Sequence, residues 1–384
     1  MKNEKIQHYH LQKQSLLTKT SHHDFEDILK KQIGLHSTDY LTPYFSLWAR
    51  VKNFEPKSLF LAISEDKSAV RMRAFRRTVF VVHRENLESI IGSMRLFLEK
   101  SIRDNLKFMV KMGMEDGSFN RIRTDMIELL KLKSPLTTSQ IKKELSSKWK
   151  GDWVKASLQL LEFEGMVARI GQRYLTDRTI KYGLFEDYFQ ELKSKAINIE
   201  KSLQNIFRLY IQQFGPITID DFSWWLPLTN TQTKKIIDSM KDDIKEFEFN
   251  SKQYFMLKDD YEIFLNCESK SESPVVNFLP YEDHYPKAYK IRNWHISDEV
   301  VTKLYDKGTI NLGQFQPSIW INGEVKGRWK VAFVDEKKTE MKIEIVFLEK
   351  KISQTKELMK LITEQKEELE IFANEKMIPL MKKN

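Results

Sequence analysis

The 384-residue chain lacks features that mark several common protein classes. It contains one cysteine, Cys267, so neither a disulfide within the chain nor a thiolate metal cluster is expected. It has no apolar run approaching the roughly 20 residues that a membrane-spanning helix needs. Its first residues, Met1 to Lys5, lack the apolar core of a secretion signal. Together these absences predict a cytoplasmic protein.

Motifs of several enzyme classes are missing too. The sequence holds no Walker-type phosphate loop, no Gly-x-Ser-x-Gly motif and no dinucleotide fingerprint, which disfavours NTPases, α/β-hydrolases and Rossmann enzymes. Four histidines near the N-terminus lack an acidic or cysteine partner at metal-ligand spacing: His8, His10, His22 and His23. We therefore expect no metal, no nucleotide cofactor and no other cofactor.

What the chain does have is positive charge and enough apolar residues to form cores. It carries 63 Lys and Arg against 54 Asp and Glu, a net charge of +9, and 41% of its residues are hydrophobic. The charge is dispersed along the chain rather than gathered in a tail. Such a balance favours a nucleic-acid partner, and a lysine-rich soluble protein is the alternative on charge alone.

Two segments follow the same plan. Residues 121–175 and 199–257 each read as three helices followed by a hairpin, which is the order of a winged helix. The expected hairpin strands are 165–170 and 173–175 in the first segment, and 244–249 and 253–257 in the second, whose first helix is expected over 199–214. Ser134-Pro135-Leu136-Thr137 in the first matches Gly215-Pro216-Ile217-Thr218 in the second. This recurrence indicates an internal duplication.

The remaining segments differ in character. A third, divergent copy is indicated by expected helices over 9–19 and 24–33, a helix from Pro56, a strand pair within 71–82 and a helix over 85–100. A polar linker at 269–274 precedes a β-rich block, in which Asn322-Gly323 signals a hairpin turn. A charged helix over 352–373 follows this block.

A polar cluster, His36-Ser37-Thr38-Asp39, follows a predicted helix over 24–33. It either caps the helix and forms a turn, or it is a catalytic site. In the second case a neutral imidazole takes a proton from water, and a nearby carboxylate supports positive charge on a sugar ring. In an extended segment His36 and Thr38 point the same way and Asp39 points the opposite way, whereas a helix turns Asp39 toward His36. The candidate catalytic residues are His36, Thr38 and Asp39.

Basic residues gather on the predicted strand pair and at the hairpin tips. On the strand pair they either contact phosphates and the minor groove or form a solvated strand face. The tips either meet the DNA backbone or are ordinary turns. The candidate DNA-binding residues are Arg71, Arg73, Arg76 and Arg77 on the strand pair, and Arg169, Gln172, Arg173 and Lys252 at the tips.

These motifs resemble the AlkZ/YcaQ-like family of winged-helix DNA glycosylases over nearly the whole chain. The segment 34–50 resembles the family's helix-to-catalytic-loop segment, and 71–82 resembles its arginine-rich ribbon. Gly215-Pro216 with Asp221-Phe222-Ser223-Trp224-Trp225 resembles its Gly-Pro and Asp-Phe-x-Trp-Trp signature. The C-terminal block is matched by Leu279-Pro280 with Asp283, and by Ile321-Asn322-Gly323 with Gly327 and Trp329.

The resemblance implies an α+β fold of three tandem winged-helix domains followed by a β-barrel-like C-terminal domain with a terminal helix. The expected boundaries are 1–115, 116–185 and 196–262 for the winged-helix domains and 274–384 for the last domain. The implied partner is double-stranded DNA. The implied activity is hydrolysis of the N-glycosidic bond of alkylated, N7-substituted purines, including bulky or crosslinked ones. We expect a monomer that binds no membrane.

The chain departs from the family at the candidate site. It has His36-Ser37-Thr38 where characterised members carry Gln-x-Gln or Gln-x-Asp, and Asp39 follows one position later. Arg77 replaces a glycine of the ribbon and Phe80 replaces its histidine. The sequence therefore represents a His-x-Thr-Asp variant. The alternative function is a non-catalytic winged-helix DNA-binding protein, either a transcriptional regulator or a lesion binder.

Overall fold

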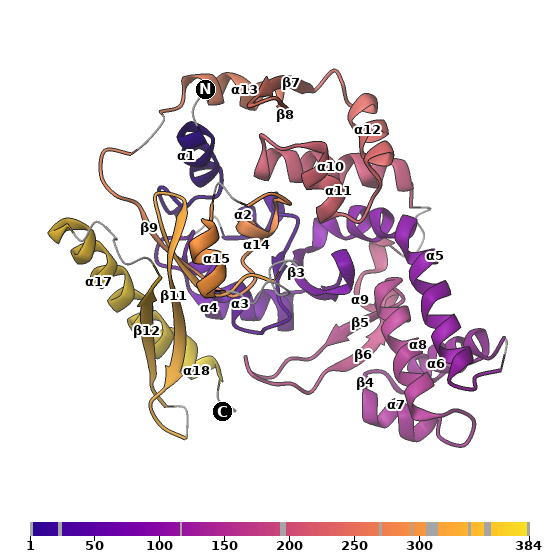
Figure 1. Ribbon diagram of the computed structural model, residues 1–384. Helices are drawn as coiled ribbons and strands as arrows, with labels where there is room; N and C mark the ends of the chain where they lie inside the picture. The colour runs from indigo at the N-terminus through magenta and orange to yellow at the C-terminus, as the bar shows by residue number, and fades with distance from the viewer. Residues whose placement is uncertain are drawn as a thin grey trace.

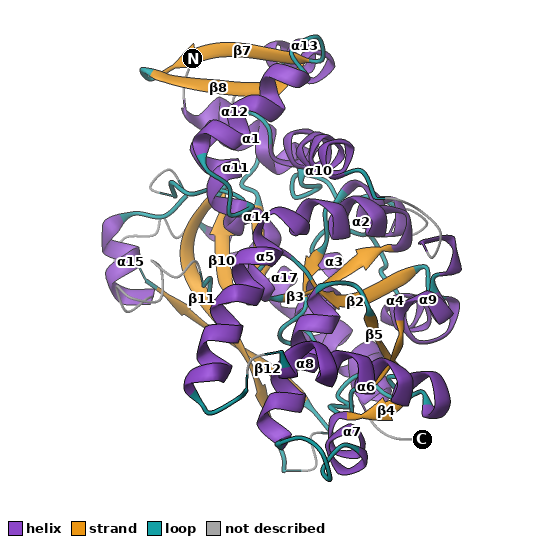
Figure 2. Cartoon of the chain, turned by 90° about the vertical axis from the view of Figure 1, so that its right-hand side faces the viewer, coloured by secondary structure: helices purple, strands orange, loops and turns teal. Residues whose placement is uncertain are grey.

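The computed structural model combines helices with four small antiparallel sheets (Figures 1 and 2). It describes residues 3–21, 25–115, 117–192, 197–268, 271–292, 295–304, 314–336, 339–348 and 355–381. None of the helices in these ranges is long and apolar enough to cross a membrane.

One order of elements, helix–strand–helix–helix–strand–strand, recurs along the chain. It first comprises α2 (Phe25–Lys31), β1 (Leu35–His36), α3 (Thr42–Trp48), α4 (Pro56–Leu61), β2 (Ala69–Arg73) and β3 (Val79–His83). It next comprises α6 (Ser118–Lys133), β4 (Leu136–Thr137), α7 (Thr138–Glu144), α8 (Gly151–Phe163), β5 (Val167–Ile170) and β6 (Lys181–Leu184). The two sheets have equivalent strand orders, β1-β3-β2 and β4-β6-β5.

A third segment repeats the order with a single bridge in place of the first strand. It comprises α10 (Ile199–Phe214), α11 (Ile219–Trp225), α12 (Asn230–Ser239), β7 (Ile244–Phe249) and β8 (Lys252–Leu257), with Ile217 bridged to Phe255 of β8. This recurrence is the order of winged-helix domains. The number of such domains and their boundaries stay predictions.

Local capping explains why the matching Pro-x-Thr segments start helices. Thr137 and Thr218 each accept a hydrogen bond from the third residue of the following helix, Gln140 or Asp221. Gln140 and Asp221 in turn accept from the backbone N–H of the threonine, which completes a capping box. The predicted helix starts at both places are confirmed.

The first wing differs from its prediction. A second strand was expected at 173–175, but β5 pairs with β6, which starts at Lys181. Leu175 is fully buried, and its N–H donates to the carbonyl of Leu380 at 2.7 Å. Residues 173–175 therefore contact the segment around Leu380 and do not pair with β5.

The helix between the first and second segments, α5 (Leu87–Lys111), and the N-terminal helix, α1 (Asn3–Lys13), both pack against the third segment or the helix that follows it. Helix α5 packs against α10, and the close approach needs Gly92, because a Cβ there would lie 2.1 Å from Oγ of Ser202. Helix α1 packs beside α13 (Lys258–Asn266), where Lys13 pairs with Asp260 at 2.8 Å. The predicted helix over residues 9–19 therefore begins and ends earlier than expected.

The C-terminal strands form an open sheet, which corrects the expected barrel-like end. β9 (Val276–Leu279), β10 (Ser318–Ile321), β11 (Glu324–Phe333) and β12 (Met341–Phe347) follow the order β12-β11-β10-β9. The predicted turn at Asn322-Gly323 is confirmed, and both residues have positive φ. At the β12 edge the N–H of Ile343 donates to Glu370 of α17 (Lys356–Ile371) at 2.7 Å. A side chain of α17 thus accepts a hydrogen bond from the edge strand, where another strand would pair in a closed barrel.

Candidate functional site

His36 lies at the end of β1 rather than at a helix terminus. β1 pairs with β3, so that His36 faces Phe80 across the ladder, and the N–H of Ser37 donates to the carbonyl of Val79 at 2.7 Å. Gly34 allows this approach, because its φ is +149° and a Cβ there would lie 2.8 Å from a methyl carbon of Val82. The extended alternative of the sequence interpretation is therefore the one observed: Oγ1 of Thr38 lies 3.3 Å from Nε2 of His36.

The carboxylate beside His36 comes from the other end of the chain. Oε2 of Glu282 lies 3.5 Å from Nε2 of His36, and both side chains are almost fully buried. Glu282 also forms an ion pair with Lys287 and accepts a hydrogen bond from the N–H of Phe315 at 2.5 Å. Sequence reasoning missed Glu282 and Lys287, and only the neighbouring Asp283 belonged to a recognised motif.

Glu282 is held in an unusual backbone conformation. Its φ is +57°, a left-handed value that is uncommon for a residue other than glycine. Its N–H donates to the carbonyl of Phe315 at 2.7 Å, and the hydroxyl of Thr42 donates to the carbonyl of Tyr281 at 3.0 Å. Backbone strain of this kind persists where the surroundings over-determine it, and it concentrates at functional sites.

A buried ion pair fixes the loop that carries Glu282. Arg50, just after α3, donates to both carboxylate oxygens of Asp283 at 2.8 and 2.9 Å, and Ser46 adds a third hydrogen bond at 2.7 Å. Arg50 and Asp283 are both fully buried. Although burial raises the pKa of Asp283, Arg50 and its other partners lower it to about 2. Helix α3 thus positions residues 281–283 beside β1.

His36, Thr38 and Glu282 line a cavity of about 250 Å³. Aromatic side chains supply much of its wall, and Arg76 and Lys287 bring positive charge to it. Burial, together with the nearby Lys287 ammonium, lowers the pKa of His36 to about 3, so the imidazole is neutral near pH 7. The aromatic lining residues are Phe75, Phe80, Trp224, Trp225 and Tyr281.

Asp39 has a capping contact rather than a contact with His36. Its Oδ1 accepts hydrogen bonds from the N–H groups of Leu41 and Thr42, at 2.9 and 3.3 Å, at the start of α3. Asp39 is exposed. The sequence interpretation placed a cap on the preceding helix over 24–33, whereas these contacts lie at the start of the following helix, α3.

The arginines of the β2–β3 ribbon differ in exposure. Arg71 is only 9% exposed, donates to the carbonyl of Ser37 at 2.7 Å and stacks on Tyr40. Arg73 and Arg169 both pair with the buried carboxylate of Glu162. The Arg73–Glu162 pair joins the first segment to the second. None of the three side chains contributes to a solvated strand face. The side chain of Arg77 lies outside the described part of the structure.

Other basic candidates do reach the surface. Arg76, at the turn between β2 and β3, is exposed, and its guanidinium lies 4.7 Å from the ring centre of Trp224. Lys252 is exposed at the start of β8. Arg173 is half exposed and pairs with Asp177 at 2.8 Å, while the amide of Gln172 donates to the carbonyl of Leu175 at 2.7 Å. The described candidate DNA-binding residues therefore differ in exposure, and only some of them face solvent.

Within the described ranges, no three His, Cys, Asp or Glu side chains gather closely enough to hold a metal ion. The chemistry available at the His36 cavity is therefore that of a neutral imidazole, a hydroxyl and a carboxylate, with cations and aromatic rings around them. Such a set can position a water molecule, take its proton and stabilise a cation.

Comparisons with known proteins agree with this picture. Residues 29–362 match the model of a family described as DNA glycosylase AlkZ-like. The DNA glycosylase AlkZ of Streptomyces sahachiroi has a similar structure, with a TM-score of 0.72, 16% sequence identity and coverage of 99% of this chain and 97% of that chain. At this identity the structural likeness supports the fold. No curated protein matches the sequence.

Proposed function

Since the chain belongs to the AlkZ-like family of DNA glycosylases, we propose that it excises alkylated, N7-substituted purines from double-stranded DNA at the His36–Glu282 pair. The observation that carries the proposal is the buried carboxylate of Glu282, 3.5 Å from a neutral imidazole in a cavity of about 250 Å³. A carboxylate held in this way can act on water and on a sugar cation without a metal ion.

An N7-alkylated purine is a good leaving group because it already carries a positive charge. In the proposed reaction the bond between C1′ of deoxyribose and N9 of the purine breaks, and its electron pair neutralises the departing base. The oxygen of a water molecule bonds to C1′, and Glu282 accepts the proton. No general acid is needed, so one carboxylate and the groups that orient it are sufficient.

In this proposal His36 orients the reacting groups. The tautomer with hydrogen on Nε2 is favoured, because the Glu282 carboxylate can accept from it and because an unpaired buried N–H costs more than an unpaired lone pair. The hydroxyl of Thr38 lies within 3.3 Å of the same nitrogen and supplies a further polar group for water. Asp39 contributes by capping α3, which positions the Glu282 loop.

The cations around the cavity suit the DNA backbone. Arg76 and Lys287 contribute two positive charges to the lining, against the one negative charge of Glu282. A surplus of positive charge favours phosphates flanking the target sugar. Arg76, which is exposed at the cavity rim, is the side chain best placed to meet one of them.

The test is release of free base from a duplex containing a single N7-methylguanine, measured by mass spectrometry. The wild-type protein is expected to release 7-methylguanine, and His36→Ala and Glu282→Gln are expected to release it much more slowly. A duplex with 8-oxoguanine, a neutral lesion, is the substrate control and should stay intact. Binding of duplex DNA with no release of either base would favour the non-catalytic alternative.

A further inference from the structure

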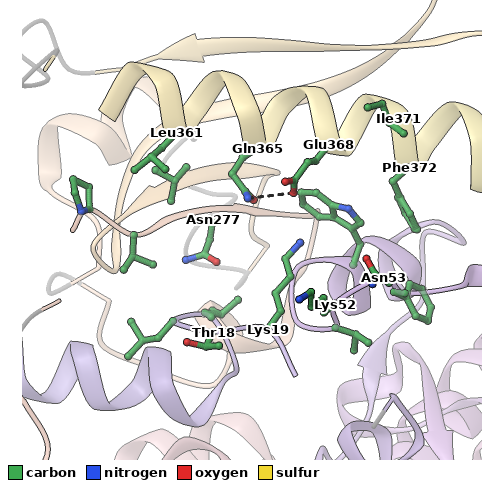
Figure 3. A pocket seen from close by; sticks show the side chains of 18 of the residues that line it. Thr18, Lys19, Lys52, Asn53, Asn277, Leu361, Gln365, Glu368, Ile371 and Phe372 are labelled. Atoms are coloured by element: carbon green, nitrogen blue, oxygen red, sulfur yellow. Dashed lines mark hydrogen bonds between the residues drawn. The ribbon is translucent and has the colours of Figure 1, made fainter. Parts of the chain in front are cut away.

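A second cavity, much larger than the first, lies between α17, β9 and the segments around Lys19 and Asn53 (Figure 3). Its volume is about 1060 Å³, which is at the upper end of the range for sites that hold small organic molecules. It shares no lining residue with the His36 cavity. The glycosylase proposal gives it no role.

Lys19 places in this cavity an ammonium that forms no ion pair with a described residue. Figure 3 shows its side chain rising from the segment below toward Gln365 and Glu368 of α17. Nζ lies 4.1 Å from the ring centre of Trp48, and among the described residues no carboxylate comes within ion-pair distance of it. Burial lowers the pKa of Lys19, although the more distant Glu368 raises it. A half-buried cation that forms no close ion pair favours binding of an anion.

Asn277 adds a polar group to the same space. It lies on β9, is 6% exposed and, as Figure 3 shows, directs its amide into the cavity. Its Nδ2 is buried and has no hydrogen-bond partner among the described residues. Most buried amide groups in proteins are paired, so this one marks a place where a bound molecule can satisfy it after a small rotation.

The rest of the lining defines the kind of ligand. Glu55 and Lys376 pair with each other, so the charges left are Lys19 and Lys52 against Glu368, a surplus of one positive charge. Buried aromatic rings of Trp48, Phe54 and Phe372 pack together along one side, with ring centres 6.1 to 6.2 Å apart for the pairs that include Phe372.

We propose that this cavity binds an organic anion in which one acidic group is attached to a flat apolar body. The acidic group, a carboxylate, sulfonate or phosphate, pairs with Lys19, and the body lies along the aromatic side. The amide of Asn277 donates to the acidic group or to an acceptor near it. This cavity shares no lining residue with the His36 cavity, so the ligand-binding proposal does not depend on the glycosylase proposal.

The experiment uses two fluorescent probes that differ in charge. One is 8-anilinonaphthalene-1-sulfonate, and the other is N-phenyl-1-naphthylamine, which has the same rings without the sulfonate. Each is titrated into the full-length protein, and calorimetry gives the stoichiometry. Lys19→Met keeps the length of the side chain and removes its charge, and Lys19→Arg restores the charge. Lys360→Met, which removes an exposed lysine elsewhere on α17, is the matched control.

The sulfonate is expected to bind at one site, and Lys19→Met is expected to weaken it by about tenfold or more, the loss typical of a charge-assisted hydrogen bond. Lys19→Arg and Lys360→Met should bind it as the wild type does, and all variants should keep the wild-type melting temperature and base release. The uncharged probe should bind more weakly and should not respond to Lys19→Met. Equal sulfonate binding by Lys19→Met and Lys360→Met, equal binding of the two probes, or no binding would each overturn the proposal.

Discussion

Replacement of Glu282 by glutamine tests whether the buried carboxylate does the chemistry. The substitution keeps the shape of the side chain and its acceptor for the N–H of Phe315, and it removes one negative charge 3.5 Å from His36. The positive charge at Lys287 then lacks its partner. The cavity becomes more positive, so binding of the DNA polyanion should stay the same or become tighter.

The expected loss of rate follows from the distance between charges. A carboxylate about 4 Å from a developing sugar cation contributes about 4 kcal/mol at an effective dielectric constant of about 20. Glutamine retains a dipole, so part of this stabilisation survives. At about 1.4 kcal/mol for each tenfold change, the rate of base release should fall by about 100- to 1000-fold. Because the effect belongs to the transition state, it should appear in kcat rather than in the affinity for DNA.

The assay is single-turnover release of 7-methylguanine from a duplex, with DNA binding measured in parallel by fluorescence anisotropy. Asp39→Asn is the matched control, since Asp39 is an acidic residue of the same region whose carboxylate caps α3. It should cost less than tenfold in rate, because the amide oxygen of asparagine can accept the same two backbone hydrogen bonds. The assignment of Glu282 would be refuted if Glu282→Gln released the base at a rate within threefold of the wild type while Asp39→Asn released it much more slowly.

Three further predictions concern charge. Because the pKa of His36 is lowered to about 3, the imidazole stays neutral as pH falls from 8 to 5. A plot of kcat/KM for base release against pH should therefore have the same shape near pH 6.5 in the wild type and in His36→Asn; an inflection that the substitution removes would contradict this. Arg71→Met should lower the free energy of unfolding by about 2 kcal/mol without changing the salt dependence of DNA binding. Arg76→Ala should instead reduce the slope of log affinity against log salt by about 0.9 and leave the free energy of unfolding unchanged. The reverse pattern would show that Arg71 is the phosphate contact. The pKa of Asp283 is lowered from 3.8 to about 2, so its charged form stabilises the fold by about 2 kcal/mol above pH 3.8, and this stabilisation is lost as pH falls toward 2. In urea unfolding, the difference in free energy of unfolding between the wild type and Asp283→Asn should therefore shrink below pH 4. A difference that stays constant with pH would contradict this assignment.

Local chemistry made much of the secondary structure predictable. The helix over 199–214 and the strand over 244–249 have the bounds expected from the sequence. Their ends depend on neighbours in the chain: Asn198 accepts a hydrogen bond from the N–H of Lys201 at 3.0 Å, and Gly215 follows the last turn. The first wing was mispredicted because a long-range contact, between Leu175 and Leu380, decides its course.

Long-range packing also decided the exposure of the charged residues. The alternation of arginines in β2 is visible in the sequence. The buried carboxylate that pairs with Arg73, Glu162 of α8, is 89 residues away in the chain, and it also pairs with the nearer Arg169. No local pattern reports such a pairing, because a glutamate in a helix is most often solvated. The sequence therefore shows where the basic residues lie in the chain, but it could not tell which of them face solvent.

The sequence by itself determined the family, the recurring helix and strand order, and the polar segment that holds His36 and Thr38, because these depend on residues close together in the chain. Only the tertiary structure placed Glu282 beside His36. That contact needs α3, whose Thr42, Ser46 and Arg50 hold the 281–283 loop, and it needs a left-handed φ at Glu282. Contacts between distant segments follow from how whole elements pack, so the carboxylate at the candidate site became visible only in the folded chain.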